Sequence, residues 1–268
     1  MDQPSVDGFN TFLVSKLAGR HVKVALSGLG GDEVFAGYPH FKIASDLSSM
    51  PRIVGRRIIE ALQERYPNRF SNYLQYFGRP SAEITAKLRV INSDYSRQRM
   101  LKSCVPLIEP AMGSGSSAYK CTSISRYEIS HYLQNTLLRD ADALSMWHSV
   151  ELRPVLLHED LVSLALSLPD RVKLRRGRLK SVMIDAVEDL VPRHVLSSPK
   201  TGFELPFRRW LNGPLRTRFV AALDSDVARR FFTQRHIRDL RDAARKGSLC
   251  RSHWLQFVLI EWTRENCL

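Results

Sequence analysis

The sequence predicts an α/β fold in which helices outweigh strands, and three observations support this prediction. Residues 22–26 (VKVAL) form a mostly apolar run with the length of a short strand. A glycine-rich stretch follows at once and leads into acidic residues that are typical of a first helical turn. Most of the later chain repeats apolar residues at helical spacing. Together they indicate an α/β domain with a large helical remainder.

Helices are predicted on both sides of this strand. Apolar residues at helical spacing predict a helix over residues 8–18 that packs beside the strand. Between residues 51 and 104 the pattern is helical but irregular, and prolines interrupt it. Residues 113–117 (GSGSS) predict an exposed loop. We therefore expect an αβα unit over residues 1–50, a helical insertion and loop over 51–117, and a helical part over 118–268.

The part after residue 117 carries a series of apolar helical stripes. Each stripe buries one face of a helix, and two of them end just before a proline, where a helix is expected to stop. Aromatic stripes of this kind usually belong to a core. The stripes cover residues 129–144, 161–168 before Pro169, 179–190 before Pro192, and 254–262.

The composition of the 268 residues is that of a globular protein, with 44% hydrophobic residues. No apolar run approaches the roughly 20 residues needed to cross a bilayer. The four cysteines are scattered and form no C-x-x-C pair, so neither a disulfide framework nor a zinc site is indicated. We expect a cytoplasmic protein without membrane contact.

The formal net charge is +13, which raises the possibility of a polyanionic partner. A solvated basic face is the favoured interpretation, and nucleic acid is an unlikely partner because no recognised RNA motif accompanies the charge. Part of the first cluster could also serve a substrate such as Mg-ATP. The positive charges gather at Arg171, Lys173, Arg175, Arg176, Arg178 and Lys180, and again at Arg208, Arg209, Arg216 and Arg218.

The glycine-rich stretch, residues 27–38 (SGLGGDEVFAGY), is the most informative motif of the chain. Where a strand ends in such a turn and opens into a helix, free backbone N–H groups favour a bound anion or phosphate. Asp32 and Glu33 then lie in the first helical turn, and a carboxylate beside a phosphate suits a bridging Mg²⁺. A plain turn whose acidic residues merely suit the helix dipole is the alternative.

The same stretch resembles a signature of the synthetase domain of glutamine-dependent asparagine synthases, S-G-x-G-x-D-E-x-x-x-G-Y. It is not a Walker A loop, because no Gly-Lys-Ser/Thr follows the glycines. Two further blocks agree with this family in order and spacing. They are residues 138–154, which resemble R-x-D-x-x-S-M followed by Glu-x-Arg and a proline-containing run, and residues 198–211, which resemble K-x-G-F-x-x-P-x-x-x-W-L.

The resemblance implies a fold, a chemistry and a set of site residues. The fold is that of an adenine nucleotide alpha hydrolase-like (PP-loop ATP pyrophosphatase) domain. The chemistry is ATP-dependent activation of an aspartate carboxylate as an acyl-adenylate, which ammonia from glutamine converts to the amide. The implied residues are Ser27, Gly28, Gly30, Gly31 and Glu33 for ATP, Asp32 for Mg²⁺, and Lys200 for charge on the reacting phosphate.

Two features of the complete family are not found in this sequence. Members begin with a glutaminase domain whose nucleophile is the cysteine after the initiator methionine, whereas residue 2 is Asp2. The S-G-G-x-D-S pyrophosphate loop, which lies upstream in the family, is also missing. We therefore expect only the C-terminal part of such a domain, with an incomplete parallel sheet whose strand at 22–26 has an open edge. No synthetase activity is expected from this chain alone.

At two positions within or next to the matched blocks the sequence departs from the family's pattern, which affects the roles that those residues can have. Leu29 stands where some relatives carry Glu or Tyr, so a side-chain base is not supported there. His158 stands where the family often has Asp. Residues Arg139, Asp140 and Asp142 are predicted near the exposed end of a helix, where they could form a site network with Glu151 and Arg153 or merely lock the helix end.

Three hypotheses follow for the function. The first is an asparagine-synthase-type ligase part that acts with a separate chain carrying the glutaminase domain and the pyrophosphate loop. The second is a non-catalytic remnant or interaction subunit. The third is a basic RNA-associated protein related to tRNA-modifying ATP pyrophosphatases, which strongly salt-dependent RNA binding would favour.

Overall fold

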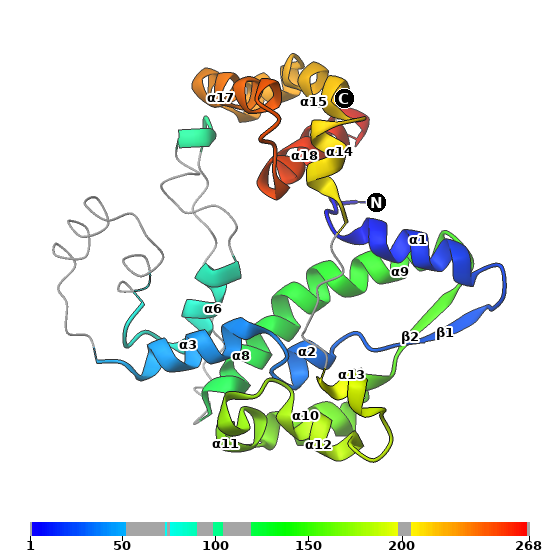
Figure 1. Ribbon diagram of the computed structural model, residues 1–268, viewed down its shortest axis with the longest axis vertical. Coiled ribbons are helices and arrows are strands. Elements are labelled where there is room, and N and C mark those ends of the chain that lie inside the picture. The colour runs from blue at the N-terminus through cyan, green and yellow to red at the C-terminus, as the bar shows by residue number, and fades with distance from the viewer. Residues whose placement is uncertain are drawn as a thin grey trace.

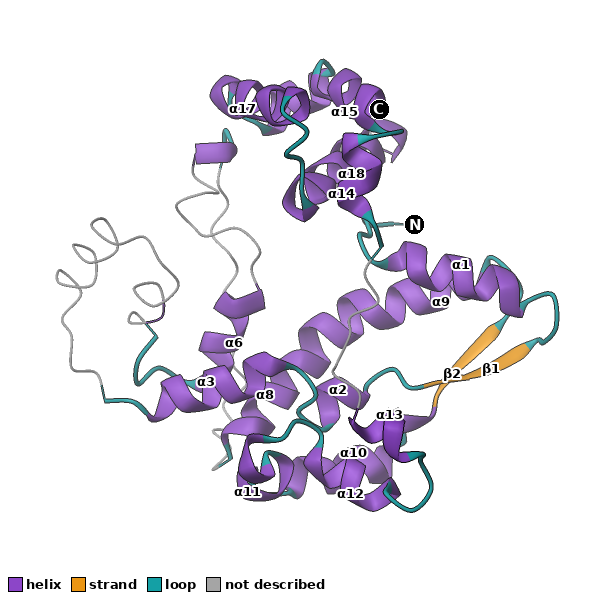
Figure 2. Cartoon of the chain, in the orientation of Figure 1, coloured by secondary structure: helices purple, strands orange, loops and turns teal. Residues whose placement is uncertain are grey.

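The computed structural model describes residues 2–51, 73, 76–89, 99–103, 119–197 and 205–266. Its elements form three groups (Figure 1): a lower group around the glycine-rich stretch, a middle layer with the sheet at one end, and helices at the C-terminal end of the chain. Helices dominate, and Figure 2 shows the two strands as the extended segments of the described chain. The prediction of a mostly helical α/β fold is thus confirmed.

The sheet of the described residues has two parallel strands, β1 (Val24–Ser27) and β2 (Glu151–Pro154). Val24 pairs with Glu151 and Ser27 with Pro154, so the strands are in register over their full length. The predicted strand at 22–26 therefore begins two residues later than expected and includes Ser27. Parallel pairing brings the carboxyl ends of both strands to the same edge, which places the glycine-rich stretch beside the chain after β2.

Helix α1 (Gly8–Ala18) has the predicted bounds and packs along α9 (Arg139–Met146). Gly8 lies at this crossing, and a Cβ there would be 2.5 Å from Leu144 Cδ1, so a larger residue would require that side chain to shift. Helix α9 is the last part of a long helical segment that begins with α8 (Lys120–Glu128) and continues through η1 (Ile129–Leu138), a π-helical stretch. The stripe predicted over 129–144 lies on this segment.

The lower group surrounds the short helix α2 (Gly31–Val34). One apolar core lies between α3 (Pro39–Ser49), α6 (Ser81–Arg89) and α8, and a smaller one joins α2 to α10. The predicted stripe at 161–168 corresponds to α10, and that at 179–190 to α12. The remaining elements are η2 (Val155–Leu157), α10 (Glu159–Ser167), α11 (Asp170–Lys173), η3 (Arg175–Gly177), α12 (Ser181–Val187) and α13 (Arg193–Ser197).

The last helices form what we call the C-terminal bundle, residues 207–266 (Figure 1). Its core is the largest of the described chain and consists of apolar side chains, among them Phe219, Leu240 and Trp254. Phe9 of α1 stacks edge-on against Trp254, so the bundle contacts the middle layer. Its helices are α14 (Phe207–Asn212), α15 (Arg216–Leu223), α16 (Asp226–Phe231), α17 (Gln234–Arg245) and α18 (Arg251–Asn266).

Several predictions fall on residues outside the described ranges. They include most of the helical insertion predicted over 51–117, the loop at 113–117, and Lys200. The boundaries of the three predicted parts therefore stay predictions. Among the helices that the structure describes, none is both long and apolar enough to cross a membrane.

Candidate functional site

The backbone turn between β1 and α2 depends on glycine at two positions. Gly30 has φ +89°, a conformation that side chains with a Cβ rarely adopt, and a Cβ there would overlap the Leu157 side chain. At Gly31 a Cβ would lie 2.7 Å from the Leu156 side chain. The turn is closed by the Gly31 N–H, which donates to the Gly28 carbonyl at 3.3 Å, and by the Leu29 N–H, which donates to Ser27 Oγ at 3.2 Å.

Asp32 lies on the exposed side of this turn and is paired with a lysine from a distant segment. Lys180 Nζ is 2.9 Å from Asp32 Oδ1, and both side chains keep about a quarter to a third of their surface exposed, 26% for Asp32 and 31% for Lys180. Lys180 precedes α12 in a left-handed conformation, φ 52°, and its N–H donates to the Ala36 carbonyl at 3.4 Å. A carboxylate and an ammonium group thus meet at the surface beside the glycine turn.

Gly37 leaves the space in which the Asp32–Lys180 ion pair lies. A Cβ on Gly37 would overlap both Asp32 Oδ1 and Lys180 Cε, so the space that a side chain would take is filled by the ion pair. The Gly37 N–H also donates to the Asp32 carbonyl at 2.8 Å, which ties the end of the motif back to its acidic residue. Gly37, near the end of the motif, therefore helps to hold Asp32 in place.

Glu33, the neighbour of Asp32, points into the protein and is 1% exposed. The Tyr38 hydroxyl donates a hydrogen bond to Glu33 Oε1 at 2.5 Å. Burial raises the pKa of Glu33, and the hydrogen bond from Tyr38 opposes that rise only in part. The predicted contact between Glu33 and a nucleotide is not supported by this placement, because the carboxylate does not share the exposed side of Asp32.

Behind Tyr38 lies a group of buried and half-buried charged and aromatic side chains that we call the polar core: Glu33, Tyr38, His40, Arg89, Glu128 and Tyr132. The Arg89 guanidinium lies between two rings, 4.5 Å from the Tyr38 centroid and 3.8 Å from that of Tyr132. It donates to both carboxylate oxygens of Glu128, at 2.9 and 2.5 Å. His40 Nε2 is 2.8 Å from Glu128 Oε1. Through these contacts α3, α6 and the long helix hold the end of the glycine motif.

The electrostatics of Glu128 reflect its partners. Burial alone would raise the pKa of this fully buried carboxyl group, but hydrogen bonds from His40 and Arg89 more than offset burial and hold the pKa below its ordinary value. Glu128 is therefore ionised in the folded protein at neutral pH. Glu33 and Tyr38 belong to the glycine motif, but the polar core was not predicted from the sequence, because the residues that join them come from separate helices and follow no local pattern.

The predicted network around α9 is divided by the structure into separate interactions. Arg139 pairs with Asp2, and the buried Asp140 accepts a hydrogen bond from the Ser5 hydroxyl at 2.5 Å. On β2, Arg153 Nε donates to Glu151 at 2.7 Å. Asp142 is exposed. A site network and a simple lock of the helix end were both open, and the described contacts join these residues in separate pairs. Arg139 and Asp140 begin α9, which is eight residues or roughly 12 Å long at 1.5 Å per residue, and Glu151 and Arg153 follow its far end.

The first basic cluster is not a continuous basic face. Lys173 is fully buried, and Lys180 pairs with Asp32. Arg175 lies 2.9 Å from Asp185, and Arg178 lies 3.7 Å from the same carboxylate. The cluster therefore contains the lysine that pairs with Asp32, although no local pattern indicated which member this would be.

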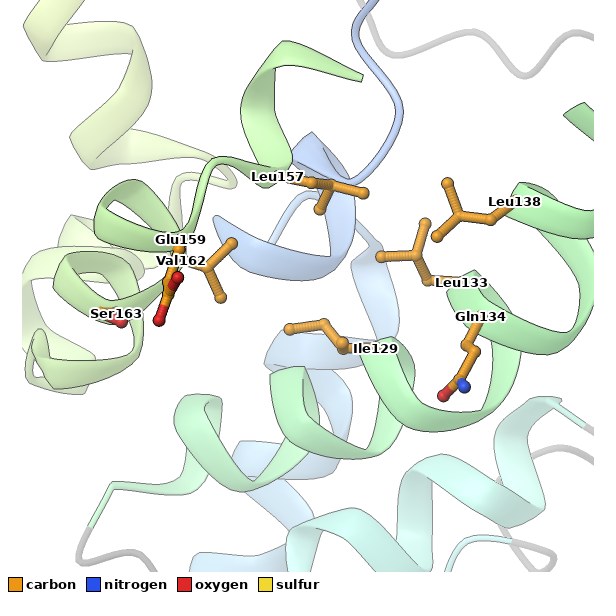
Figure 3. Close-up of a pocket in the computed structure, with 8 residues that line it drawn as sticks. All are labelled: Ile129, Leu133, Gln134, Leu138, Leu157, Glu159, Val162 and Ser163. Carbon is orange, nitrogen blue, oxygen red and sulfur yellow. The ribbon is translucent and has the colours of Figure 1, made fainter. Parts of the chain in front are cut away.

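A mostly apolar pocket lies between η1, η2 and α10 (Figure 3). Its volume is about 350 Å³. Leu157, whose side chain also lies against Gly30, is the point where the pocket approaches the glycine turn. None of the predicted site residues lines it. The lining residues are Ile129, Leu133, Gln134, Leu138, Leu157, Glu159, Val162 and Ser163.

The ligands available at the turn suit a metal ion that is bound together with a substrate, and do not suit one that is held by the protein alone. Within the described ranges, no group of three or more His, Cys, Asp or Glu side chains is placed to hold a metal ion alone. Asp32 offers one partly exposed carboxylate beside a lysine. Mg²⁺ is commonly held by one or two carboxylates together with substrate phosphates and water. The site therefore fits a Mg²⁺ ion that arrives with a phosphate, not one that the protein holds by itself.

Comparison with known proteins gives a family over almost the whole chain. The family model described as asparagine synthase matches residues 1–264. The asparagine synthetase [glutamine-hydrolyzing] 1 of Bacillus subtilis (strain 168) is 26% identical over 279 residues, which cover 99% of this chain and 44% of the relative. Putative asparagine synthetases [glutamine-hydrolyzing] of Mycobacterium bovis and Mycobacterium tuberculosis are 27% identical over 281 residues, or 98% of this chain and 42% of each relative. The chain thus spans less than half the length of these relatives.

Proposed function

The chain belongs to the asparagine synthase family, and we propose that it supplies part of the ATP site of an amide-forming ligase. The proposed reaction is the ATP-dependent amidation of aspartate through a β-aspartyl-AMP intermediate. The observation that carries this proposal is the Asp32–Lys180 pair at the glycine turn. The fold proposed for the complete domain is the PP-loop ATP pyrophosphatase fold, to which the two parallel strands would belong.

The chemistry explains why a carboxylate and a lysine are needed together. A substrate carboxylate has to approach an α-phosphate that is also negative, so positive charge must accumulate where the new bond forms. Bound Mg²⁺ would supply part of this charge by neutralising the phosphate oxygens. Asp32 is the residue that would hold the ion, and Lys180, 2.9 Å from Asp32, would turn toward phosphate oxygens. Lys200 remains the predicted second lysine.

The backbone of the turn has a role of its own in this proposal. Ser27, Gly28, Gly30 and Gly31 would contact the nucleotide, and a Cβ added at Gly28 would meet no atom within 4 Å. The open space on that side of the turn is where a phosphate could approach the main chain. Glu33 is assigned to the support of the turn through Tyr38 and not to the nucleotide.

We further propose that the chain does not complete the reaction by itself. The matched relatives are more than twice as long as the region that they share with this chain. A second polypeptide segment with the glutaminase domain and the S-G-G-x-D-S loop would provide ammonia and the remaining phosphate contacts. The alternative of a non-catalytic remnant differs from this proposal in one measurable property, since a remnant would bind no nucleotide.

The test is Mg-ATP binding to the purified chain by isothermal titration calorimetry. We expect Asp32→Ala, Lys180→Ala and Lys200→Ala each to weaken binding, by about tenfold for every 1.4 kcal/mol lost. Asp226→Ala is the matched control, because Asp226 is 98% exposed and lies on α16 in the C-terminal bundle. A folded chain that binds no Mg-ATP, or one whose binding survives Asp32→Ala, would contradict the proposal.

A further inference from the structure

We propose that a pocket between α15 and α17 of the C-terminal bundle binds a small molecule that carries one or two phosphate groups. Three arginines line this pocket together with two apolar residues, and its volume is about 330 Å³. The inference goes beyond the proposed function, because none of the residues assigned to ATP or Mg²⁺ lines this pocket. We call it the arginine pocket: Arg216, Val220, Arg241, Ala244 and Arg245.

The spacing of the lining residues along the two helices explains how they meet. Arg216 and Val220 are four residues apart on α15, so they lie on one side of that helix. Arg241 and Arg245 have the same spacing on α17, and Ala244 lies between them. Helices α15 and α17 pack against each other in the bundle (Figure 1). The pocket therefore combines guanidinium groups from both helices with apolar side chains.

The three arginines of the pocket are compensated only in part by carboxylates. Arg241 donates to Asp224, which fixes this guanidinium and leaves others of its five N–H groups available. Arg245 is 3.3 Å from Asp242, but both side chains are well exposed, and such pairs are weak. In the part of the chain that the structure describes, Arg216 forms no ion pair with a carboxylate. Positive charge therefore remains uncompensated in the pocket.

The surrounding bundle strengthens this positive field. Residues 207–266 contain thirteen Lys or Arg but only six Asp or Glu, so the bundle carries more than half of the excess positive charge of the chain. Guanidinium groups gathered in one pocket repel each other, and a bound anion offsets that repulsion. A pocket lined by one sign of charge also concentrates ions of the opposite sign. The electrostatics therefore favour an anionic ligand.

The geometry of arginine and the size of the pocket indicate which anion this is. A guanidinium fork donates two parallel hydrogen bonds to a phosphate, and a phosphate monoester carries about 1.5 to 2 negative charges at neutral pH, more than a carboxylate does. A pocket of about 330 Å³ lies at the lower end of the range of about 300–1,000 Å³ that is usual for small-molecule sites. Val220 and Ala244 suit an apolar part of the ligand. These properties together point to a phosphorylated small molecule.

The experiment titrates the full chain with inorganic pyrophosphate by isothermal titration calorimetry, with EDTA in place of Mg²⁺. Salt is kept at about 0.15 M, where a Debye length of about 8 Å screens the general attraction of a basic surface. We expect Arg216→Gln and Arg245→Gln each to weaken binding by about tenfold or more, because each removes a charged fork of donors. Arg218→Gln is the matched control: it removes the same charge from the same helix, but Arg218 pairs with Glu261 and does not line the pocket. All three arginines are exposed, so unfolding curves are expected to stay close to wild type.

Three outcomes would overturn the inference. The first is a wild-type chain that does not bind pyrophosphate, or that loses the same affinity in Arg216→Gln and Arg218→Gln, because these arginines would then be a solvated basic face. The second is binding that Lys180→Ala abolishes and Arg216→Gln leaves unchanged, which would assign the pyrophosphate to the glycine turn. The third is a single-stranded RNA oligonucleotide that binds more tightly than pyrophosphate and is weakened by Arg216→Gln, since the pocket would then contact a nucleic-acid backbone.

Discussion

The C-terminal bundle and the region around the glycine turn are stabilised in different ways. The buried side chains of the bundle that the structure describes carry no formal charge, and its core is made of aromatic and aliphatic groups such as Phe219, Leu240 and Trp254. Around the turn, by contrast, the apolar cores are smaller and charged groups are buried beside them. These are Glu33, Glu128, Asp140 and Lys173.

This difference shows what each region is built to do. Apolar packing is non-directional, so it stabilises the bundle without fixing any one polar group. Buried charges cost desolvation energy and are compensated only by specific partners in specific directions. Arg89 satisfies Glu128 and lies over Tyr38, and Tyr38 in turn holds Glu33 beside Asp32. The polar core therefore fixes the geometry of the turn, at the cost of the desolvation energy of its buried charges.

The largest effect is expected from Glu128→Ala, which removes the centre of the polar core. The substitution leaves the partly buried Arg89 and His40 without their carboxylate, and we expect the free energy of unfolding to fall by about 3–5 kcal/mol. Urea unfolding followed by far-UV circular dichroism measures this loss. Glu83→Ala is the control, because the Arg79–Glu83 pair is partly exposed and such pairs contribute about 1 kcal/mol or less.

The same variant tests the contrast between the two regions. Trp210, Trp254 and Trp262 lie in the bundle and Trp147 does not, so in a Trp147→Phe background the fluorescence follows the bundle and not the polar core. If the bundle is stabilised independently, the fluorescence transition of this background keeps its midpoint when Glu128→Ala is added, while the dichroism signal loses part of its amplitude early. A fluorescence midpoint that falls together with the dichroism signal would show one cooperative unit, and the contrast would be withdrawn.

The next largest effect is the contribution of Lys173 to the pH dependence of the free energy of unfolding. Its side chain is fully buried, with Nζ donating to Thr122 Oγ1 at 3.3 Å, and burial lowers its pKa from 10.5 to about 8. Between these values the unfolded chain binds the proton and the folded chain does not, so stability rises with pH across this window. The rise amounts to roughly 3 kcal/mol at about 1.4 kcal/mol per pH unit.

Lys173→Met should remove this contribution while keeping the volume of the side chain. The informative quantity is the difference between wild type and variant in the free energy of unfolding, measured from pH 7 to 10.5. This difference is needed because burial raises the pKa of Cys121 to about 12, which acts in the opposite sense above pH 9. Lys42→Met, at an exposed lysine, is the control and should keep the wild-type dependence. Parallel curves for wild type and Lys173→Met would refute the assignment.

The sequence predicted the elements better than the contacts between them. Helix α1 has the predicted bounds because its apolar spacing is a local signal, and the strand β1 is displaced by two residues at its start. The Asp32–Lys180 pair and the Arg89–Glu128 pair join residues far apart in the chain. No periodicity encodes which lysine of a basic cluster reaches a given carboxylate, because the tertiary fold decides it.

The residues of the possible α9 network lie in separate pairs for a related reason. The motif that resembles the family lies on one continuous stretch, but that stretch is a helix followed by a strand, and it carries its charges to opposite ends. Proximity in sequence was thus a poor guide to proximity in space. The glycines were the better signal, since Gly30 and Gly37 each lie where a Cβ would overlap a neighbouring side chain.

The smallest effect, and the sharpest test of the turn, is expected from Gly37→Ala. Its methyl group would overlap Asp32 Oδ1 and Lys180 Cε, so we expect a loss of about 1–3 kcal/mol, as for other overpacked sites. Gly28→Ala is the matched control, because a Cβ there meets nothing within 4 Å. Thermal unfolding compares the two variants. Since the ion pair must move to admit the methyl group, Gly37→Ala should weaken Mg-ATP binding as well, although it removes no polar atom. Equal unfolding free energies for the two variants would mean that the Asp32–Lys180 pair is free to move away, and that the turn is less rigidly held than the polar core behind it.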